Sequence, residues 1–218
     1  MTAMLGSLLP SWVECHEHFG EAVDGYLFPE EEKVVERAVD GRRRQYATVR
    51  RCARAGLAGL GHPPTPILPG RGGAPAWPAG VRGSMTHCSQ YAAAAVAPSE
   101  RVVTIGIDAE PDAPLPAGVL ELVATPEECL RLPTPRTSQP CWDRLLFSAK
   151  ESVYKAWFPV VREWLDPLET VVAIAEDGWF TAALLRDGLA HGSSRISRLR
   201  GRWAAGGGIV LTGVIVSA

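Results

Sequence analysis

The sequence predicts an α+β protein that forms one large domain or two compact lobes of about 100 residues each. The first observation is its length of 218 residues, of which 46% are apolar and 21% charged, a balance typical of folded proteins. The second is that apolar residues recur at helical spacing in two long stretches and alternate in others. The third is that the second half of the chain places a long helix first and several strands after it.

Two helices are expected in the first third of the chain. Pro29 is followed by three acidic residues, which favours a helix N-terminus at this point. Gly41 interrupts this helix, and residues 42–60 resume with an apolar stripe before Gly61 and Pro63. The stripe consists of Tyr46, Val49, Cys52, Ala53, Leu57 and Leu60.

The middle of the chain is expected to pass from irregular structure to strands. Residues 61–83 are rich in glycine and proline and predict an irregular loop with short extended pieces, a common place for binding elements. Residues 85–96 are small and apolar, which is compatible with a buried strand or hairpin. Residues 102–110 alternate clearly, so Asp108 and Glu110 share one face of a predicted strand.

The last third is predicted to contain one helix and three strands. Prolines break the chain after residue 110, and residues 142–164 then predict a long helix. Residues 171–175, 179–185 and 209–216 predict strands separated by turns that contain glycine.

Composition limits the classes of function. Lys and Arg total 22 and Asp and Glu total 24, a formal net charge of -2, so no overall field attracts nucleic acid or an anionic membrane. The five cysteines are odd in number and include no C-x-x-C pair, which favours reduced thiols in a cytoplasmic protein. No basic region precedes the first apolar run, and no apolar run reaches about 18 residues, so neither a signal peptide nor a membrane helix is expected.

Asp108 and Glu110 are candidates for binding a hard cation. Gly106 beside them allows another backbone or a ligand to approach closely. Mg²⁺ prefers a few carboxylates together with water and substrate phosphate oxygens. On spacing alone, a solvated strand end before Pro111 is the commoner meaning of this pattern.

Glu151 and Lys155 are four residues apart on the predicted long helix and share a face. Such a pair is most often an ordinary surface ion pair that contributes about 0.3–0.5 kcal/mol. Here the charged residues Lys150, Glu151 and Lys155 are crowded among aromatic ones, so part of their charge should be buried, and partly buried mixed charge indicates a site. These aromatic residues are Phe147, Tyr154, Trp157 and Phe158.

An arginine-rich stretch forms the concentrated positive patch of the chain. Arg50 and Arg54 share a helix face, and arginine suits bidentate phosphate recognition, although a solvated basic face or an RNA-binding helix would also explain the patch. His87 follows the glycine-rich loop, where a hydrogen-bonded structural histidine is the commoner interpretation. Residues 15–18, Cys-His-Glu-His, lack zinc-site spacing, and residues 69–73 lack the G-K-[ST] of a P-loop. The arginines are Arg42, Arg43, Arg44, Arg50, Arg51 and Arg54.

Taken together, two segments resemble the paired signature of 4'-phosphopantetheinyl transferases. They are Ile105-Gly106-Ile107-Asp108-Ala109-Glu110 and, about forty residues later, Phe147-Ser148-Ala149-Lys150-Glu151-Ser152-Val153-Tyr154-Lys155. Further similarity is carried by the helix at residues 42–61, by Gly73-Ala74-Pro75-Ala76-Trp77-Pro78 and by Ser84-Met85-Thr86-His87-Cys88. The resemblance covers roughly residues 27–215 and is closest to the Sfp-type, actinobacterial type II subgroup.

The resemblance implies transfer of the 4'-phosphopantetheine arm of coenzyme A to a serine of apo acyl or peptidyl carrier proteins, with release of adenosine 3',5'-bisphosphate. Polyketide, nonribosomal peptide and fatty acid synthesis are the pathways this subgroup serves. The resemblance assigns Mg²⁺, with Mn²⁺ as an alternative, to Asp108, Glu110 and Glu151, and it makes Glu151 the base for the serine proton. Asp108, Glu151 and Lys155 are the expected catalytic residues. The expected contacts with coenzyme A are Arg42, Arg50, Thr86, His87, Lys150 and Lys155.

The family fold consists of two similar α+β lobes with pseudo-twofold symmetry and an active site between them. On this basis we expect an N-terminal lobe at residues 1–103 and a C-terminal lobe at residues 104–218, in one monomeric unit that binds neither nucleic acid nor membrane. The carrier protein is expected near the helix of the second motif, against exposed apolar residues among 157–164. Relatives often have a lysine in the loop at residues 69–72, where this chain offers Arg71.

Three other functions remain as hypotheses. They are a coenzyme A or nucleotide binding module without turnover, an RNA binder that uses the arginine-rich helix, and a magnesium-dependent hydrolase of coenzyme A. The hydrolase would release free phosphopantetheine without a carrier, and the RNA binder would keep salt-dependent RNA binding after Asp108→Ala.

Overall fold

The computed structural model describes residues 4–133, 140–191 and 194–218. In the first half, the chain forms η1 (Leu5–Ser7), β1 (Glu14–Phe19), α1 (Pro29–Val34), α2 (Asp40–Gly59), η2 (Arg71–Gly73), β2 (Val81–Cys88) and β3 (Tyr91–Pro98). In the second half, it forms β4 (Val102–Pro111), α3 (Val119–Val123), α4 (Pro126–Arg131), α5 (Trp142–Val161), η3 (Pro167–Glu169), β5 (Thr170–Ile174), β6 (Trp179–Leu184), β7 (Leu189–His191), β8 (Ser194–Ile196), β9 (Arg198–Gly206) and β10 (Ile209–Ser217).

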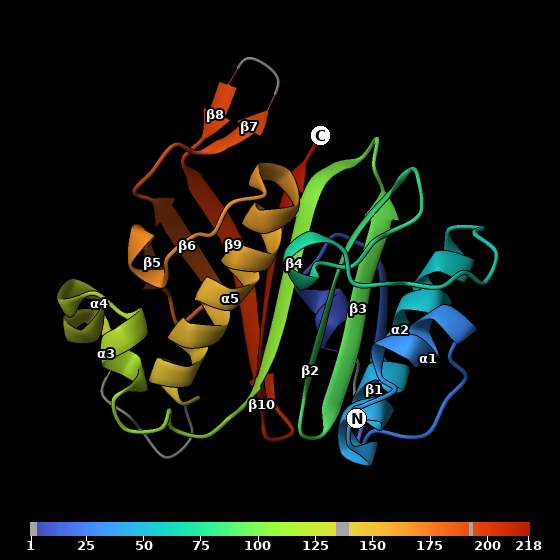
Figure 1. Ribbon diagram of the computed structural model, residues 1–218. Helices are drawn as coiled ribbons and strands as arrows, with labels where there is room; N and C mark the ends of the chain where they lie inside the picture. The colour runs from blue at the N-terminus through green and yellow to red at the C-terminus, as the bar shows by residue number, and fades with distance from the viewer. Residues whose placement is uncertain (1–3, 134–139, 192–193) are drawn as a thin grey trace.

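Two antiparallel sheets form the framework, and a 20-residue helix packs against each of them (Figure 1). The first sheet has the strand order β1-β3-β2 and the second the order β4-β10-β9-β6-β5, while β7 and β8 form a short separate ribbon. Helix α2 lies against the first sheet and α5 against the second. The predicted α+β architecture is thus confirmed.

The elements that sequence periodicity predicted are present with shifted ends. They are α1, α2, the β2–β3 hairpin, β4, α5, β5, β6 and β10. The predicted interruption at Gly41 is wrong, because α1 already ends at Val34 and Gly41 is the second residue of α2. Strand β2 already begins at Val81, inside the expected loop. Helix α5 ends at Val161 rather than at Trp164, because Pro159 occupies its last turn and Arg162 has a left-handed φ of 62°.

Several elements were not predicted, and each lacks a clear periodic signal. Strand β1 is an edge strand whose residues are mostly polar and all half-buried. Strand β9 carries Arg198, Arg200 and Arg202 on its outer face, with Leu199 and Gly201 facing inward. Helices α3 and α4 have five and six residues, too few for an apolar stripe to repeat.

Gly106 allows α5 to lie directly on β4. A Cβ atom at this position would overlap the carbonyl oxygen of Ser152, so the helix backbone occupies the space that a side chain would need. Next to it, Thr104 donates a hydrogen bond to the Ala156 carbonyl oxygen (2.7 Å). The close approach expected at Gly106 is therefore confirmed, and the group that approaches is helix backbone.

The two sheets meet where β2 lies beside β4 in the centre of the molecule (Figure 1). The Ile107 amide donates to the Ser84 hydroxyl (3.1 Å), and the Ala109 amide donates to the Thr86 hydroxyl (3.0 Å). Side chains of β2 thus satisfy backbone groups of β4 where the two strands belong to different sheets. This joint fixes the two helices on the same side of the molecule, facing each other across β2 and β4.

All five cysteines are free thiols. Among the residues that the structure describes, we find no helix with the length and apolarity that a membrane crossing requires.

Candidate active site

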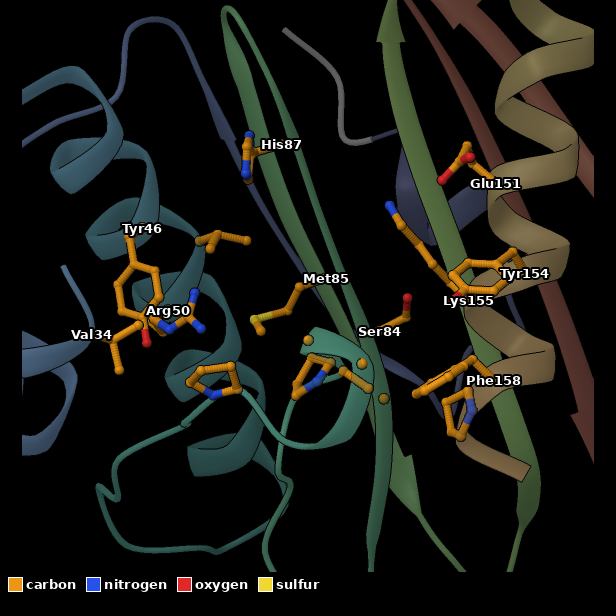
Figure 2. A pocket seen from close by; sticks show the side chains of 18 of the residues that line it. Val34, Tyr46, Arg50, Ser84, Met85, His87, Glu151, Tyr154, Lys155 and Phe158 are labelled. Carbon is orange, nitrogen blue, oxygen red and sulfur yellow. The ribbon is translucent and has the colours of Figure 1, made fainter. Parts of the chain in front are cut away.

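A cleft of about 530 Å³ lies between α2 and α5, floored by β2 and bordered by the loop before β2 (Figure 2). Tyr46 and Arg50 face it from α2, and Glu151 and Lys155 face it from α5. The loop contributes small and rigid residues: Pro69, Gly72, Gly73, Ala74 and Pro75. The cleft therefore collects charged residues from segments about a hundred residues apart in the sequence.

Two ion pairs connect the carboxylates of β4 to basic residues of α5. Lys155 Nζ lies 2.7 Å from Asp108 Oδ1, and Arg144 Nη1 lies 2.9 Å from Glu110 Oε2. Glu151 stands between these two basic residues in the sequence of α5 and lines the cleft. The structure thus brings the predicted residues Asp108, Glu110, Glu151 and Lys155 to one helix–strand interface.

The carboxylates at this interface repel one another. The pKa of Glu151 is raised, first by burial and then by the negative charge of Asp108, while Lys155 partly offsets the rise. The pKa of Glu110 is raised by burial and by Asp108, with Arg144 acting in the opposite direction. A cation placed among these carboxylates would offset the cost of burying their negative charges and would reduce the repulsion between them.

The donor set fits a hard divalent cation in its chemistry. Asp108 Oδ2 is buried and has no hydrogen-bond partner among the described residues, an unsatisfied oxygen that needs a donor or a metal ion. Carboxylate oxygens are the ligands that Mg²⁺ prefers. In the described part of the chain, however, no group of three or more His, Cys, Asp or Glu side chains has the geometry of a metal site. Asp108 and Glu110 are paired with Lys155 and Arg144 instead.

The opposite wall of the cleft carries basic and aromatic groups. Arg42 Nη1 lies 2.8 Å from His87 Nε2. Burial and the positive charges of Arg42, Lys155 and Arg50 lower the pKa of His87 to about 4, so the ring is neutral at neutral pH. The Arg50 guanidinium stacks 3.2 Å over the Tyr46 ring centre, and burial lowers the pKa of Arg50 to about 10, so it stays charged.

The rest of the arginine-rich stretch is engaged elsewhere. Arg54 forms an ion pair with the buried Glu31, and Arg43 pairs with Glu32. Arg71, the basic residue of the loop, is exposed and does not line the cleft. Of the helix arginines, Arg42 and Arg50 are the two that line it, which gives no support to a continuous RNA-binding face.

Two predicted contacts with coenzyme A, Lys150 and Thr86, do not line the cleft. Lys150 is buried on another side of α5, where its ammonium group donates to Glu128, to the Pro167 carbonyl and to the Thr170 carbonyl, each at 2.8 Å. Thr86 is also buried. Its hydroxyl donates to Asp108 Oδ1 at 3.3 Å, so it helps to hold this carboxylate in place. Sequence spacing places Lys150 beside Glu151 but does not show which face of the helix packs against neighbouring elements.

The apolar half of the cleft and one of its basic neighbours, Arg144, were not predicted from the sequence. Tyr46 was assigned to the helix core stripe, and Tyr154 and Phe158 to an apolar surface, yet all three line the cleft. Val34, Ala38 and Met85 line it as well. Arg144 belonged to no motif, although its spacing of seven residues from Glu151 placed both on one helix face.

Carboxylates paired with basic residues, facing arginines across a cleft, are typical of enzymes that act on phosphate esters. The chain belongs to the 4'-phosphopantetheinyl transferase superfamily. The sequence model of this superfamily matches residues 104–205, and that of the 4'-phosphopantetheinyl transferase N-terminal domain matches residues 30–97.

Characterised relatives agree with this assignment. The chain is 51% identical to the 4'-phosphopantetheinyl transferase Svp of Streptomyces mobaraensis, over 99% of this chain and 90% of that protein. It is 42% identical to PptT of Mycobacterium tuberculosis (86% and 85% covered) and 42% identical to Npt of Nocardia iowensis (97% and 99% covered). Both of these are 4'-phosphopantetheinyl transferases.

Proposed function

We propose that this protein transfers the 4'-phosphopantetheine group of coenzyme A to a serine of apo acyl or peptidyl carrier proteins and releases adenosine 3',5'-bisphosphate. The observation that carries the proposal is the cleft in which Glu151 and Lys155 face Arg42, Arg50 and His87. Family membership supports the same reaction.

In the proposed reaction, the serine oxygen attacks the phosphorus that bears the pantetheine arm. A new phosphorus–oxygen bond to serine forms, and the bond to the bridging oxygen of the pyrophosphate breaks, with the electron pair leaving on the nucleotide. Glu151 takes the serine proton, directly or through a water, and its pKa, raised by burial and by Asp108, makes it a stronger base than a solvated carboxylate. Lys155 places positive charge beside the pyrophosphate.

The basic wall is proposed to hold the nucleotide half of coenzyme A. Arg42 and Arg50 would bind phosphate, and neutral His87 would donate a hydrogen bond without adding charge. The aromatic and aliphatic residues beside them, Tyr46 and Met85 among them, offer apolar contact to the rest of the molecule. Arg71 is left as an exposed residue of the loop at the rim.

We propose that Mg²⁺, or Mn²⁺ in its place, is held by Asp108, Glu110 and Glu151. When bound, the ion would neutralise the pyrophosphate oxygens and the charge that develops on the leaving group. The unsatisfied Asp108 Oδ2 and the raised pKa of Glu110 and Glu151 support this assignment. Lys155 must then exchange Asp108 for phosphate, which its long stem allows.

For the whole molecule, we propose that residues 1–103 and 104–218 act as two lobes of a monomer. The carrier is proposed to dock beside α5, where the Trp164 side chain is 63% exposed and packs against Tyr154, with ring centres 5.0 Å apart. Trp157 is buried and is excluded as a contact.

The test is the intact mass of a purified apo carrier domain after incubation with this protein, coenzyme A and Mg²⁺, beside an EDTA control. We expect a metal-dependent mass gain of one phosphopantetheine on the carrier serine. Several carriers without any mass gain would contradict the proposal. Release of free phosphopantetheine without a carrier would then indicate a hydrolase, and tight coenzyme A binding without turnover would indicate a binding module.

A further inference from the structure

We propose that Arg144 is a positioning residue that fixes the Glu110 carboxylate for the magnesium site, an inference that rests on the function proposed above. Arg144 lies in the first turn of α5 and has no place in either sequence motif. Counting along α5, Arg144, Glu151 and Lys155 are separated by seven and four residues and lie on the face that packs on β4.

The guanidinium of Arg144 is anchored at three points. Its Nη1 donates to Glu110 Oε2 (2.9 Å), its Nε to the Ala113 carbonyl (3.0 Å) and its Nη2 to the Pro114 carbonyl (2.9 Å). A planar group with all three nitrogens engaged has little freedom to rotate. Arg144 therefore sets the direction of the Glu110 carboxylate as well as balancing its charge.

Lys155 holds Asp108 in a different way. Its ammonium makes one short contact with Asp108 (2.7 Å) and a long one with Thr86 (3.5 Å), and its side chain is 29% exposed against 15% for Arg144. The lysine can leave its carboxylate, whereas the arginine is fixed. At Glu110, the described residues supply a donor to Oε2 and none to Oε1, so the second oxygen is available to a cation.

The need to hold the Glu110 carboxylate in one orientation explains why residue 144 is an arginine. Groups that orient metal ligands typically change metal affinity or activity about 10–100-fold when they are removed. A lysine at position 144 would keep the charge but could not reach Glu110 and both carbonyls at once. Replacement of Arg144 by lysine therefore separates the orientation of the Glu110 carboxylate from the positive charge beside it.

The loop after β4 offers a matched control. Asp143 Oδ2 accepts a hydrogen bond from the Leu115 amide (2.9 Å), so Asp143 also holds this loop to α5 but does not touch Glu110. Asp143→Ala loosens the same loop without changing the carboxylate. A purely structural role of Arg144 would make the two variants behave alike.

The experiment is a titration of the full-length protein with Mn²⁺, followed by electron paramagnetic resonance of the free ion. We expect Arg144→Met to weaken Mn²⁺ binding about 10-fold or more and Arg144→Lys to recover only part of it, while Asp143→Ala stays within about threefold of the unmodified protein. In the transfer assay, Arg144→Met should lower kcat and raise the Mn²⁺ requirement, and the KM for coenzyme A should stay nearly constant.

Mn²⁺ binding by folded Arg144→Met within threefold of the unmodified protein would overturn the proposal. Full recovery in Arg144→Lys would also overturn it, since charge alone would then suffice, and this variant serves if Arg144→Met does not fold. If the unmodified protein transfers phosphopantetheine but substitution of Arg144 does not change Mn²⁺ binding, the positioning role is refuted. The proposed function then remains intact. Absence of transfer by the unmodified protein would refute the proposed function instead.

Discussion

Glu151 carries a charge that the surrounding protein does not compensate fully. Among the described residues it accepts no hydrogen bond, and burial together with Asp108 and Glu110 raises its pKa. A carboxylate in this state is a better base than a solvated one and gains more from a cation. The residue that stands between the two ion pairs of the site is thus the one free to react.

We expect Glu151→Gln to lower phosphopantetheine transfer at least about 100-fold, because the amide neither takes a proton nor binds Mg²⁺ strongly. The rate is measured from the intact mass of the carrier. Glu163→Gln is the control, since Glu163 is an exposed partner of Arg186 beyond the end of α5. Normal transfer by Glu151→Gln would remove both proposed roles of this residue.

The lowered pKa of His87 predicts that the stability of the folded protein depends on pH. Its pKa is about 4 in the folded protein and about 6.5 in the unfolded chain, so between these values the unfolded chain binds a proton that the folded protein does not. His87 therefore lowers the free energy of unfolding as pH falls from about 6.5 to 4. Urea unfolding at a series of pH values should show a shallower acid loss for His87→Gln than for His62→Gln, which lies beyond α2 and outside the cleft. Equal slopes in the two variants would contradict the assigned environment of His87.

At the scale of elements, α5 serves two purposes with two different faces. One face presents Glu151 and Lys155 to the cleft, and another inserts Lys150 between α4 and β5. Glu128 completes that contact, because it also accepts the Val172 amide (2.7 Å) and the Thr125 amide (2.7 Å). The motif that carries chemistry thus also contains a structural ion pair.

We expect Lys150→Met to lower the free energy of unfolding by about 3–5 kcal/mol, because it leaves Glu128 buried and unpaired. The double variant Glu128→Gln/Lys150→Met should lose less than the sum of the single variants in denaturant titrations. The KM for coenzyme A should not change in the protein that remains folded. A large rise of this KM at unchanged stability would show that Lys150 faces the substrate after all.

The glycine-rich loop packs against α5 at Gly72. Gly72 has a φ of +63°, and a Cβ atom there would overlap the Phe158 ring, whereas Gly73 has a φ of +81° and open space around it. Alanine at either position costs about 1–2 kcal/mol of stability, because its backbone must be left-handed. Of the two variants, only Gly72→Ala also displaces Phe158. We expect the KM for coenzyme A to rise about tenfold more in Gly72→Ala than in Gly73→Ala. Steady-state kinetics with equal KM values would exclude this loop–helix contact as a determinant of the cleft.

At the scale of the whole molecule, the N-terminal segment connects the two sheets. Leu5, Leu8 and Leu9 are buried in one apolar cluster with residues of β3, β4 and β10. Glu17 on β1 holds the segment, because its Oε1 accepts the Met4 and Leu5 amides at 3.1 Å and the Tyr91 hydroxyl at 2.6 Å. The segment thus covers the side of the sheets away from the cleft and ties β1 to β10.

We expect Glu17→Ala to cost about 1–3 kcal/mol for each donor that it leaves buried without a partner. Its thermal unfolding midpoint should fall in a single transition, since both sheets share the segment, and Glu17→Gln should lose less because its amide oxygen still accepts. Transfer per folded molecule should persist, as Glu17 lies outside the cleft. Two separate unfolding transitions would show that the sheets do not depend on this segment together.

The class of fold, the main helices and strands, the family and four charged residues that meet between β4 and α5 could all be predicted from the sequence. This was possible because periodic apolar spacing reports which face of an element is buried, and because Asp108, Glu110, Glu151 and Lys155 form a local pattern at fixed spacing. Four elements were not predicted: β1 is mostly polar, β9 contains glycine and several arginines, and α3 and α4 are too short for a period to repeat.

The direction in which each charged side chain points depends on the packing of distant segments and could not be read from the sequence. Lys150 and Glu151 are neighbours in the sequence, yet one ends in a buried ion pair and the other in the cleft, because adjacent residues on a helix point about 100° apart and different elements pack on each side. Arg144 gained its place through two backbone carbonyls that follow β4, and no spacing rule within α5 contains them. The sequence shows the chemical type of each residue, but the burial of a side chain and its ion-pair partner depend on how the whole chain packs.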